Sequence, residues 1–292
     1  MSSSSRADHW LGTTDPLPLA LYRAGFGALL CGECLTRLPY AEELYSAVGF
    51  HRSGVGAWAP PTPFAYALVL LTAAGAAAIS LGWRTRLASV VTLVTWTWLH
   101  AIDQINEKAL HSVIIVVLAL LALSDAGAAR SLDARRAGGD APAVWATPLR
   151  LLQLQFAQVY FFAGVAKLFA AGWITGSVLQ LSLSSRWATD TGLWVATWIP
   201  DVAVRLLALL TVIYELVGPW LLFVPWARPW VIAFGVSFHA GIQSTLSIGW
   251  LGSHFILALL TLYPDPATWR RALAYARARL PRGRADGMTA PP

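Results

Sequence analysis

A single lysine lies within an otherwise apolar stretch and is the side chain best placed to do chemistry. The stretch reads Val159-Tyr-Phe-Phe-Ala-Gly-Val-Ala-Lys-Leu-Phe, and Lys167 is one of two lysines in the chain. A desolvated amine can act as a base near neutral pH. With equal weight, Lys167 could instead extend its charge to a membrane surface, about one turn from Gly172 and Trp173.

Two polar residues precede Lys167 at a spacing that puts them on its helix face. Gln153, Tyr160 and Lys167 are seven residues apart, and each heptad drifts by only about 20° around an α-helix. We therefore expect Gln153 and Tyr160 to line the same site as Lys167, with Trp173 just beyond it.

Four histidines fall at a depth similar to that of Lys167. His100 ends the third expected helix, His111 opens the fourth, His239 lies in the seventh and His254 opens the eighth. A lone histidine is more often a structural hydrogen-bonding group, but several at one depth indicate a polar cavity that opens outward. His239, Gln243 and Ser247 are four residues apart, so they share one helix face and would line that cavity.

Tyr214 and Glu215 lie in the middle of another apolar segment. An ionisable group in hydrocarbon costs several kcal/mol, so it needs a partner or a function. Gly218 and Pro219 follow, and such a pair can loosen a helix where a ligand inserts. With equal weight, Glu215 neutralises a membrane cation such as Arg23 or Lys167.

Metal and thiol chemistry are less favoured by the spacing. There is no HxxH or HxxxH pair, and His100 with Asp103 suits an orienting hydrogen bond, so no metal is predicted. The segment Cys31-Gly-Glu-Cys34 would permit thiol–quinone redox chemistry. Buried thiols serving as small core residues are more common, and a regular helix holds such a pair poorly for a disulfide.

The amino-acid composition predicts the kind of fold, and the environment, in which these residues lie. Hydrophobic residues make up 57% of the 292 residues and charged residues 12%, about half the usual share. There are 15 tryptophans, and the charges behind the net +6 are scattered. These values exclude a disordered chain, a nucleic-acid-binding module and an ordinary cytosolic enzyme. They predict an all-α, polytopic membrane bundle that contacts lipid.

About eight transmembrane helices are expected, because a bilayer core needs roughly 20 apolar residues per span. The last segment is short, so seven spans remain possible. We expect a polar N-terminal tail at 1–15, one membrane domain at 16–263, an Arg- and Pro-rich tail at 264–292, and an interfacial helix over Trp173–Trp187. The expected helices are Pro16–Leu38, Pro63–Trp83, Leu87–Gln104, Leu110–Ser124, Pro148–Ala171, Val202–Val224, Pro229–Leu246 and Leu251–Tyr263.

Basic residues predict the orientation in a bacterial plasma membrane. With both termini cytoplasmic, fourteen Arg residues fall inside and five Arg or Lys residues outside. This asymmetry follows the positive-inside rule. The cavity with Lys167 would then face outward.

Several motifs, in chain order, resemble the vitamin K-dependent γ-carboxylase-like family, also called the HTTM (horizontally transferred transmembrane) domain. The most specific is the segment from Gln153 to Leu168, followed by Trp173 and Gly176. The other matches are Tyr22-Arg-Ala-Gly-Phe-Gly, Ser131-Leu-Asp, Tyr214-Glu-Leu-Val-Gly-Pro, Phe238-His-Ala-Gly-Ile-Gln and Ser247-Ile-Gly.

The resemblance implies an enzyme that deprotonates a reduced quinone of the vitamin K or menaquinol type. Oxygenation of the quinol by O2 gives the epoxide and a strong base, which drives carboxylation of a glutamate by CO2. By motif, Lys167 would be the catalytic base, with His111 and His239 positioning or relaying protons. The other candidates named above would then bind the quinone: His100, Gln153, Tyr160, Trp173, Tyr214, Glu215 and Gln243.

The chain also departs from the animal carboxylases. Ala166 stands where they have a second lysine, and we expect no counterpart of the large C-terminal region that holds their protein substrate. The acceptor is therefore expected to be a peptide, a small molecule, or a protein brought by a separate recognition partner. Two other functions stay open: a thiol–quinone oxidoreductase using Cys31 and Cys34, and a non-catalytic membrane module for toxin maturation or immunity.

Overall fold

The computed structural model describes residues 10–52, 58–104 and 109–279. Most of the predicted N-terminal tail, the loop residues Asn106 and Lys108, and the end of the C-terminal tail lie outside the described residues. Within them the fold is all-α, as predicted, apart from a two-residue antiparallel pairing of β1 (Thr13–Thr14) with β2 (Val144–Trp145).

All eight predicted long helices are present within a few residues of their expected ends. Proline marks the start of four of these helices. It lies in the first turn of α2, α4, α8 and α13, where a backbone N–H would have no partner within the helix. Gly82 ends α4 at a φ of 67°, which glycine adopts readily. The eight are α2 (Leu17–Arg37), α4 (Thr62–Leu81), α5 (Thr85–Ile102), α6 (Ala109–Ala122), α8 (Thr147–Leu168), α12 (Asp201–Leu221), α13 (Arg228–Thr245) and α14 (Leu251–Leu262).

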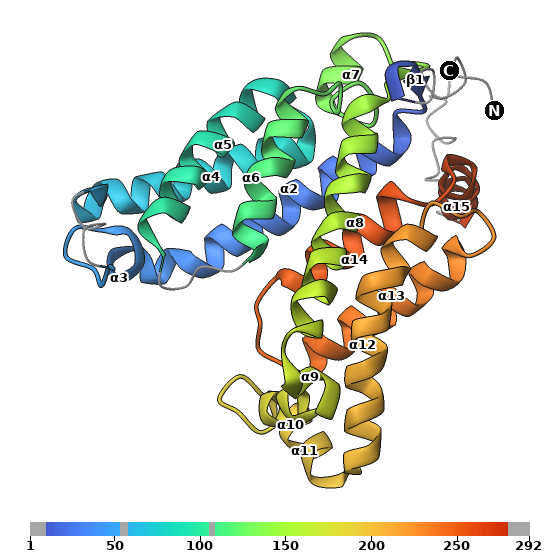
Figure 1. Ribbon diagram of the computed structural model, residues 1–292. Helices are drawn as coiled ribbons and strands as arrows, with labels where there is room; N and C mark the ends of the chain where they lie inside the picture. Colours follow the sequence, from blue (N-terminus) through green and yellow to red (C-terminus); the bar gives the residue numbers. More distant parts are fainter. Residues whose placement is uncertain (1–9, 53–57, 105–108, 280–292) are drawn as a thin grey trace, which may run out of the picture.

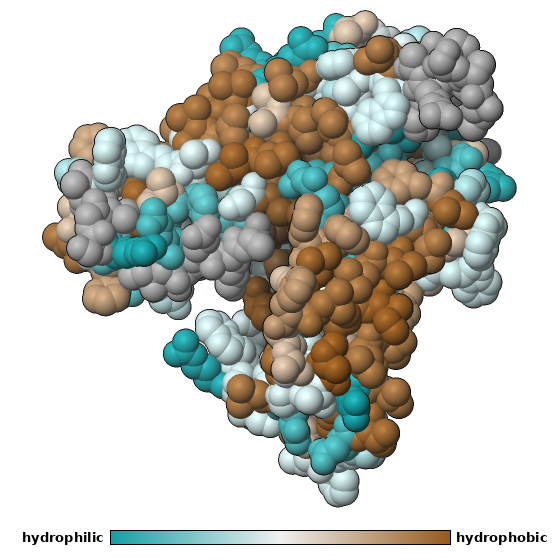
Figure 2. Space-filling view, viewed as in Figure 1, coloured by the Kyte–Doolittle hydropathy of each residue, from teal (hydrophilic) through white to brown (hydrophobic). Residues whose placement is uncertain are grey.

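These helices form two lobes (Figure 1). In the first, α2 packs on α4, α4 on α5 and α5 on α6. In the second, α12 packs on α8 and α13 on α14. The lobes meet where α14 contacts α2 and where α6 contacts α8, and the space-filling view is hollowed between their far ends (Figure 2).

Short helices close both ends of the molecule. A 3-10 turn (η1, Leu38–Tyr40) and α3 (Ala41–Tyr45) follow α2, and α7 (Leu132–Arg136) precedes α8. The predicted interfacial helix is instead three short helices, α9 (Ala171–Thr175), α10 (Ser177–Leu183) and α11 (Asp190–Trp198). The start of the predicted C-terminal tail is helical as α15 (Pro266–Arg279), so the last apolar helix ends at Leu262 and does not continue to Trp269.

Two of the long helices, α4 and α12, are long and apolar enough by length and composition to cross a membrane. Their outward surfaces are apolar, as the brown areas of Figure 2 illustrate for one face. Contiguous exposed apolar surface on this scale is typical of contact with lipid. The exposed apolar residues include Leu70 and Leu71 on α4, Val90 and Val94 on the neighbouring α5, and Leu206, Leu207, Leu210 and Ile213 on α12.

Two of the sequence motifs hold helix ends together at the end of the molecule that carries α7. The fully buried Arg23 donates from Nη1 to the Ser80 carbonyl (2.7 Å), from Nε to the Ala126 carbonyl (3.1 Å) and from Nη2 to the Arg130 carbonyl (2.9 Å), and Nη1 also bonds the Ile79 carbonyl. Arg23 therefore satisfies the free carbonyls at the end of α4 and is not the partner of Glu215.

The Ser131-Leu-Asp motif forms two helix caps. Ser131 caps α7 by accepting the Ala134 amide at 2.8 Å. Asp133 accepts the Arg84 and Thr85 amides, each at 2.8 Å, and so caps the start of α5. Partial burial raises the pKa of Asp133, but the hydrogen bonds from Thr85 and Arg84 outweigh it and hold that pKa below its usual value.

Candidate functional site

Lys167 is paired with Glu215. Its Nζ lies 2.7 Å from Oε2 of Glu215, and the side chains are only 18% and 9% exposed. The face of the Trp173 ring lies 4.8 Å from the same nitrogen, which adds a cation–π contact. Gly164 lets α12 approach, because a Cβ there would press on Glu215 and Leu216. Of the two expected partners for Glu215, the structure has Lys167.

Tyr160 and His239 form the second polar contact of this cluster. The Tyr160 hydroxyl lies 2.6 Å from His239 Nε2, and both side chains are buried. The other ring nitrogen of His239, Nδ1, is buried without a hydrogen-bond partner among the described residues. A buried polar atom of this kind is costly unless something bonds to it.

Aromatic rings enclose the Tyr160–His239 contact. Phe255 stacks on His239 with ring centroids 5.1 Å apart and meets Tyr160 edge-on at 4.9 Å. Tyr214 meets Tyr160 at 5.6 Å, and Phe238 packs against both Tyr214 and His239. Helices α8, α12, α13 and α14 thus provide flat apolar walls with a few polar atoms among them. We refer to Lys167, Glu215, Trp173, Tyr160, Tyr214 and His239 as the lysine cluster.

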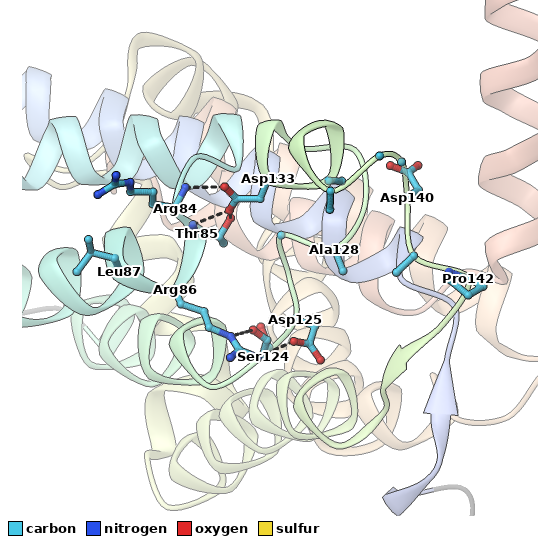
Figure 3. Close-up of a pocket in the computed structure, with 16 residues that line it drawn as sticks. Arg84, Thr85, Arg86, Leu87, Ser124, Asp125, Ala128, Asp133, Asp140 and Pro142 are labelled. Atoms are coloured by element: carbon cyan, nitrogen blue, oxygen red, sulfur yellow. Dashed lines mark hydrogen bonds and ion pairs between the residues drawn. The ribbon is translucent and has the colours of Figure 1, made fainter.

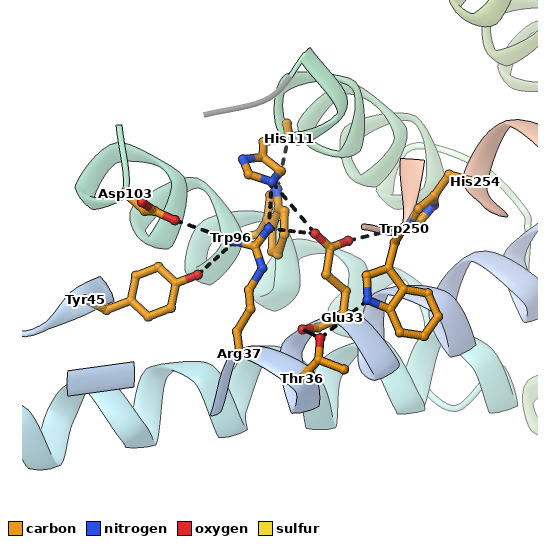
Figure 4. A network of polar contacts seen from close by, with 9 residues as sticks. All are labelled: Glu33, Thr36, Arg37, Tyr45, Trp96, Asp103, His111, Trp250 and His254. Atoms are coloured by element: carbon orange, nitrogen blue, oxygen red, sulfur yellow. Dashed lines mark hydrogen bonds and ion pairs between the residues drawn. The ribbon is translucent and has the colours of Figure 1, made fainter. Parts of the chain in front are cut away.

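His111 and His100 lie in a different cluster, on the other lobe. Arg37 is its centre: Nη2 of Arg37 lies 2.7 Å from Glu33 Oε1 and 2.7 Å from His111 Nε2 (Figure 4). A guanidinium group can only donate, so Nε2 of His111 accepts and carries no proton. The His100 and His111 rings meet edge-on at 5.7 Å.

Further side chains complete this second cluster. We refer to Glu33, Arg37, Tyr45, His100, Asp103, His111 and His254 as the carboxylate cluster. Glu33 Oε2 lies 3.6 Å from His254 Nε2, which joins α2 to α14. Arg37 Nη1 donates to the Tyr45 hydroxyl at 2.9 Å and lies 3.8 Å from Asp103 Oδ2. Burial raises the pKa of Tyr45 to about 12, against the opposing effect of Arg37, so Tyr45 keeps its proton at neutral pH.

The remaining candidates lie away from Lys167. Gln153 is on the predicted face of α8, but fourteen residues separate it from Lys167, about 21 Å along the helix. Its amide donates to the Leu262 carbonyl at 2.6 Å, and its oxygen accepts from Arg150 at 3.0 Å. Gln243 donates to the Gly249 carbonyl at 2.8 Å and so holds the loop between α13 and α14.

Sequence reasoning missed Glu33, Arg37, Tyr45 and Trp96, whose Nε1 donates to the His111 carbonyl at 3.2 Å, and it considered Asp103 only as a partner of His100. The available signal was the spacing of Glu33 and Arg37, four residues apart in a predicted membrane helix, where an acid and a base share one face. Cys31 and Cys34, on the same helix, are free thiols, and Cys34 packs in the core. Among the described residues, no group of three or more His, Cys, Asp or Glu side chains is arranged to hold a metal ion.

A surface hollow lies elsewhere, away from the lysine cluster. A cavity of about 790 Å³ sits between the starts of α5 and α7 (Figure 3). Three of its charged groups are already engaged: Arg86 lies 2.5 Å from Asp125, and Asp133 caps α5. We therefore base the site on the lysine cluster, where buried groups can react, and not on the size of a hollow.

Comparison with known proteins supports the motif reading. A family model described as HTTM domain matches residues 12–269, nearly the whole described chain. No solved structure matches the chain.

Proposed function

The chain belongs to the HTTM domain family, a family of transmembrane domains associated with vitamin K-dependent carboxylase-like proteins, and on that premise we propose that it is a quinol-dependent enzyme. The observation that carries the proposal is the pairing of Lys167 with Glu215 beside the Tyr160–His239 contact. The family match alone does not specify an activity, whereas this geometry supplies a base, its proton acceptor and a hydrogen-bonding pair.

The residues of the lysine cluster fit a reduced quinone. A quinol is a flat ring with two hydroxyl groups. Phe255, Tyr214 and Phe238 offer apolar faces, and His239 Nδ1 offers a buried hydrogen-bonding atom without a partner among the described residues. Trp173, which lies over Lys167, would close the edge of the site.

Lys167 and Glu215 would act as a base pair that shares a proton. When the ammonium proton passes to Glu215, Lys167 is a neutral amine and accepts the proton of a quinol hydroxyl. At 2.7 Å, Nζ of Lys167 and Oε2 of Glu215 are close enough for such a transfer. Tyr160 and His239 would bind and orient the second hydroxyl.

The bound quinol supplies the oxygen chemistry: quinol, O2, CO2 and a glutamate give the quinone epoxide, water and a carboxylated glutamate. The protein's residues hold the quinol, move its first proton and exclude water. We place His111 in an indirect role, because it lies in the carboxylate cluster with its Nε2 bonded to Arg37. The acceptor would be a peptide or a small molecule, presented alone or by a recognition partner.

We further propose that all eight long helices cross a bacterial plasma membrane with both termini in the cytoplasm. The N-terminal strand β1, α7 and α15 lie toward one end of the molecule (Figure 1), and Arg84, Arg130, Arg150 and Arg228 lie in the predicted inner segments. Lys167 lies near the far end of α8, which would place the reaction on the outer side.

The test is quinone epoxide formation by the purified chain in lipid, given reduced naphthoquinone and O2. Lys167→Met should abolish it. Gln158→Met is the matched control, since Gln158 lies on the same helix and bonds only Gln155. Folding of each variant is checked by thermal unfolding. If well-folded wild-type protein makes no epoxide from several quinols, the enzymatic proposal is wrong and the non-catalytic module is favoured.

A further inference from the structure

A second cavity, of about 310 Å³, lies at the opposite end of α8 from Lys167. Two arginines line it, Arg150 from the first turns of α8 and Arg228 from the first residue of α13. They are half-buried and line the same cavity, so their like charges face a shared space. No acidic side chain of the described residues lies within 4.0 Å of either arginine, which distinguishes them from Arg37, Arg86, Arg130 and Arg270.

The donors of these arginines are only partly used. Arg150 Nη1 bonds Gln153 at 3.0 Å, while its buried Nε has no hydrogen-bond partner among the described residues. Arg228 Nε donates to the Leu222 carbonyl at 2.8 Å, which fixes the guanidinium group and leaves its terminal nitrogens available. Each guanidinium carries five N–H donors, so several have no protein partner among the described residues and can bind a ligand or water.

The position adds to the positive potential. Both arginines lie at helix N-termini, where the helix dipole is positive and where cations are disfavoured. The nearest acid in the cavity wall is Asp265, whose carboxylate caps α15 by accepting the Ala267 amide at 2.7 Å. Two like charges at two positive helix ends disfavour one another, and an anion between them would offset this.

We propose that this cavity binds a phosphate oxyanion, with Arg150 and Arg228 as its ligands. Paired guanidinium groups match the geometry of phosphate oxygens, and charge-assisted hydrogen bonds are the strongest in proteins. The phosphate can be a phospholipid headgroup or free inorganic phosphate. Pro18, Leu149 and Phe223 in the cavity wall would suit the start of an acyl chain.

The experiment uses the full chain in phosphatidylcholine nanodiscs, with the thermal unfolding midpoint followed by tryptophan fluorescence. One arm adds phosphatidylglycerol to the lipid, and the other adds inorganic phosphate against chloride at equal ionic strength. A ligand that binds only the folded state raises the midpoint. A rise with phosphatidylglycerol alone identifies the headgroup, and a rise with inorganic phosphate identifies the free ion; either result supports the site.

The variants are Arg150→Gln and Arg228→Gln, with Arg271→Gln as the control. Arg271 is exposed on nearby α15 and does not line the cavity, and its substitution by glutamine removes the same charge. Each cavity variant should weaken binding by about tenfold or more, because a hydrogen bond to a charged group is lost, whereas Arg271→Gln should bind as wild type. Arg228→Lys replaces any glutamine variant that does not fold, and should weaken binding while keeping the charge.

Two results would overturn the proposal. In the first, the wild-type chain gains no stability from either phosphate source. In the second, Arg271→Gln loses as much of the gain as Arg150→Gln, which would mean that net charge alone attracts the anion. Neither result depends on quinol chemistry, so failure here leaves the proposed function untouched.

Discussion

Nζ of Lys167 and Oε2 of Glu215 lie 2.7 Å apart, in side chains that are mostly withdrawn from solvent. Removing one member of such a pair leaves an uncompensated charge, whereas removing both can be close to neutral. Stability and activity should therefore respond differently to single and double substitutions, which allows the catalytic role of Lys167 to be separated from its structural one.

Lys167→Met should lower the free energy of unfolding by about 3 kcal/mol or more, because the Glu215 carboxylate loses its partner. The double variant Lys167→Met, Glu215→Leu should recover most of that loss. Quinol-dependent activity should fall by at least about 100-fold in both variants, since both lack the base. A double variant that recovers activity together with stability would show that Lys167 is structural only.

Tyr160→Phe should reduce quinol turnover without unfolding the protein. The change removes the hydroxyl 2.6 Å from His239 Nε2 and leaves that nitrogen buried without this partner, at a cost of about 1–3 kcal/mol. The aromatic packing with Phe255 and Tyr214 is kept. The check is a comparison of KM with kcat: we expect a larger KM, because the pair orients the quinol. Unchanged values of both would remove Tyr160 and His239 from the binding site.

Glu33→Gln should destabilise the protein far more than breaking an exposed ion pair. Glu33 is 3% exposed, is paired with Arg37 and lies 3.6 Å from His254, so loss of its charge should cost about 3–5 kcal/mol. Arg86→Gln is the comparison. It breaks an ion pair whose side chains are 65% and 43% exposed, which is worth about 0–1 kcal/mol. Similar losses of unfolding free energy in the two variants would mean that the carboxylate cluster does not stabilise the contact between the lobes.

Asp133→Asn should lower stability at neutral pH and make little difference in acid. The folded-state pKa of Asp133 is below its ordinary value, because its hydrogen bonds from Thr85 and Arg84 outweigh the effect of burial. Its stabilisation is therefore present above the unfolded pKa of about 3.9 and is lost as pH falls through the lower folded value. The free energies of unfolding of wild type and Asp133→Asn should differ by about 1 kcal/mol at pH 7. The difference should disappear as the pH is lowered into the acid range. A difference that persists in acid would contradict the capping role.

The helices and the residues of the lysine cluster could be predicted largely because both depend on local spacing. Tyr160 and Lys167 share a face of α8, and Tyr214 and Glu215 lie together in α12, so packing of the two helices brings four predicted residues into one cluster. Gln153 shows the limit of the same argument. A heptad spacing fixes the face of a helix, but not the distance along it.

The carboxylate cluster and the carbonyl contacts of Arg23 depend on tertiary structure. Arg23 meets carbonyls from residues 79–80 and 126–130, more than fifty positions away in sequence. His111 lies at the predicted depth but on the other lobe, because depth in a bilayer does not state which helices are neighbours. These contacts carry no local pattern, so the sequence alone assigned His111 to the wrong neighbours.

Consecutive residues of α14 serve the two clusters at once. His254 faces Glu33, and Phe255 covers His239 and Tyr160. Any tilt or rotation of α14 that moves the Phe255 ring on the lysine cluster also changes the distance from His254 to Glu33. A ligand beside His239 that moved α14 would therefore also move His254 relative to Glu33, and by thermodynamic linkage any such coupling would be reciprocal.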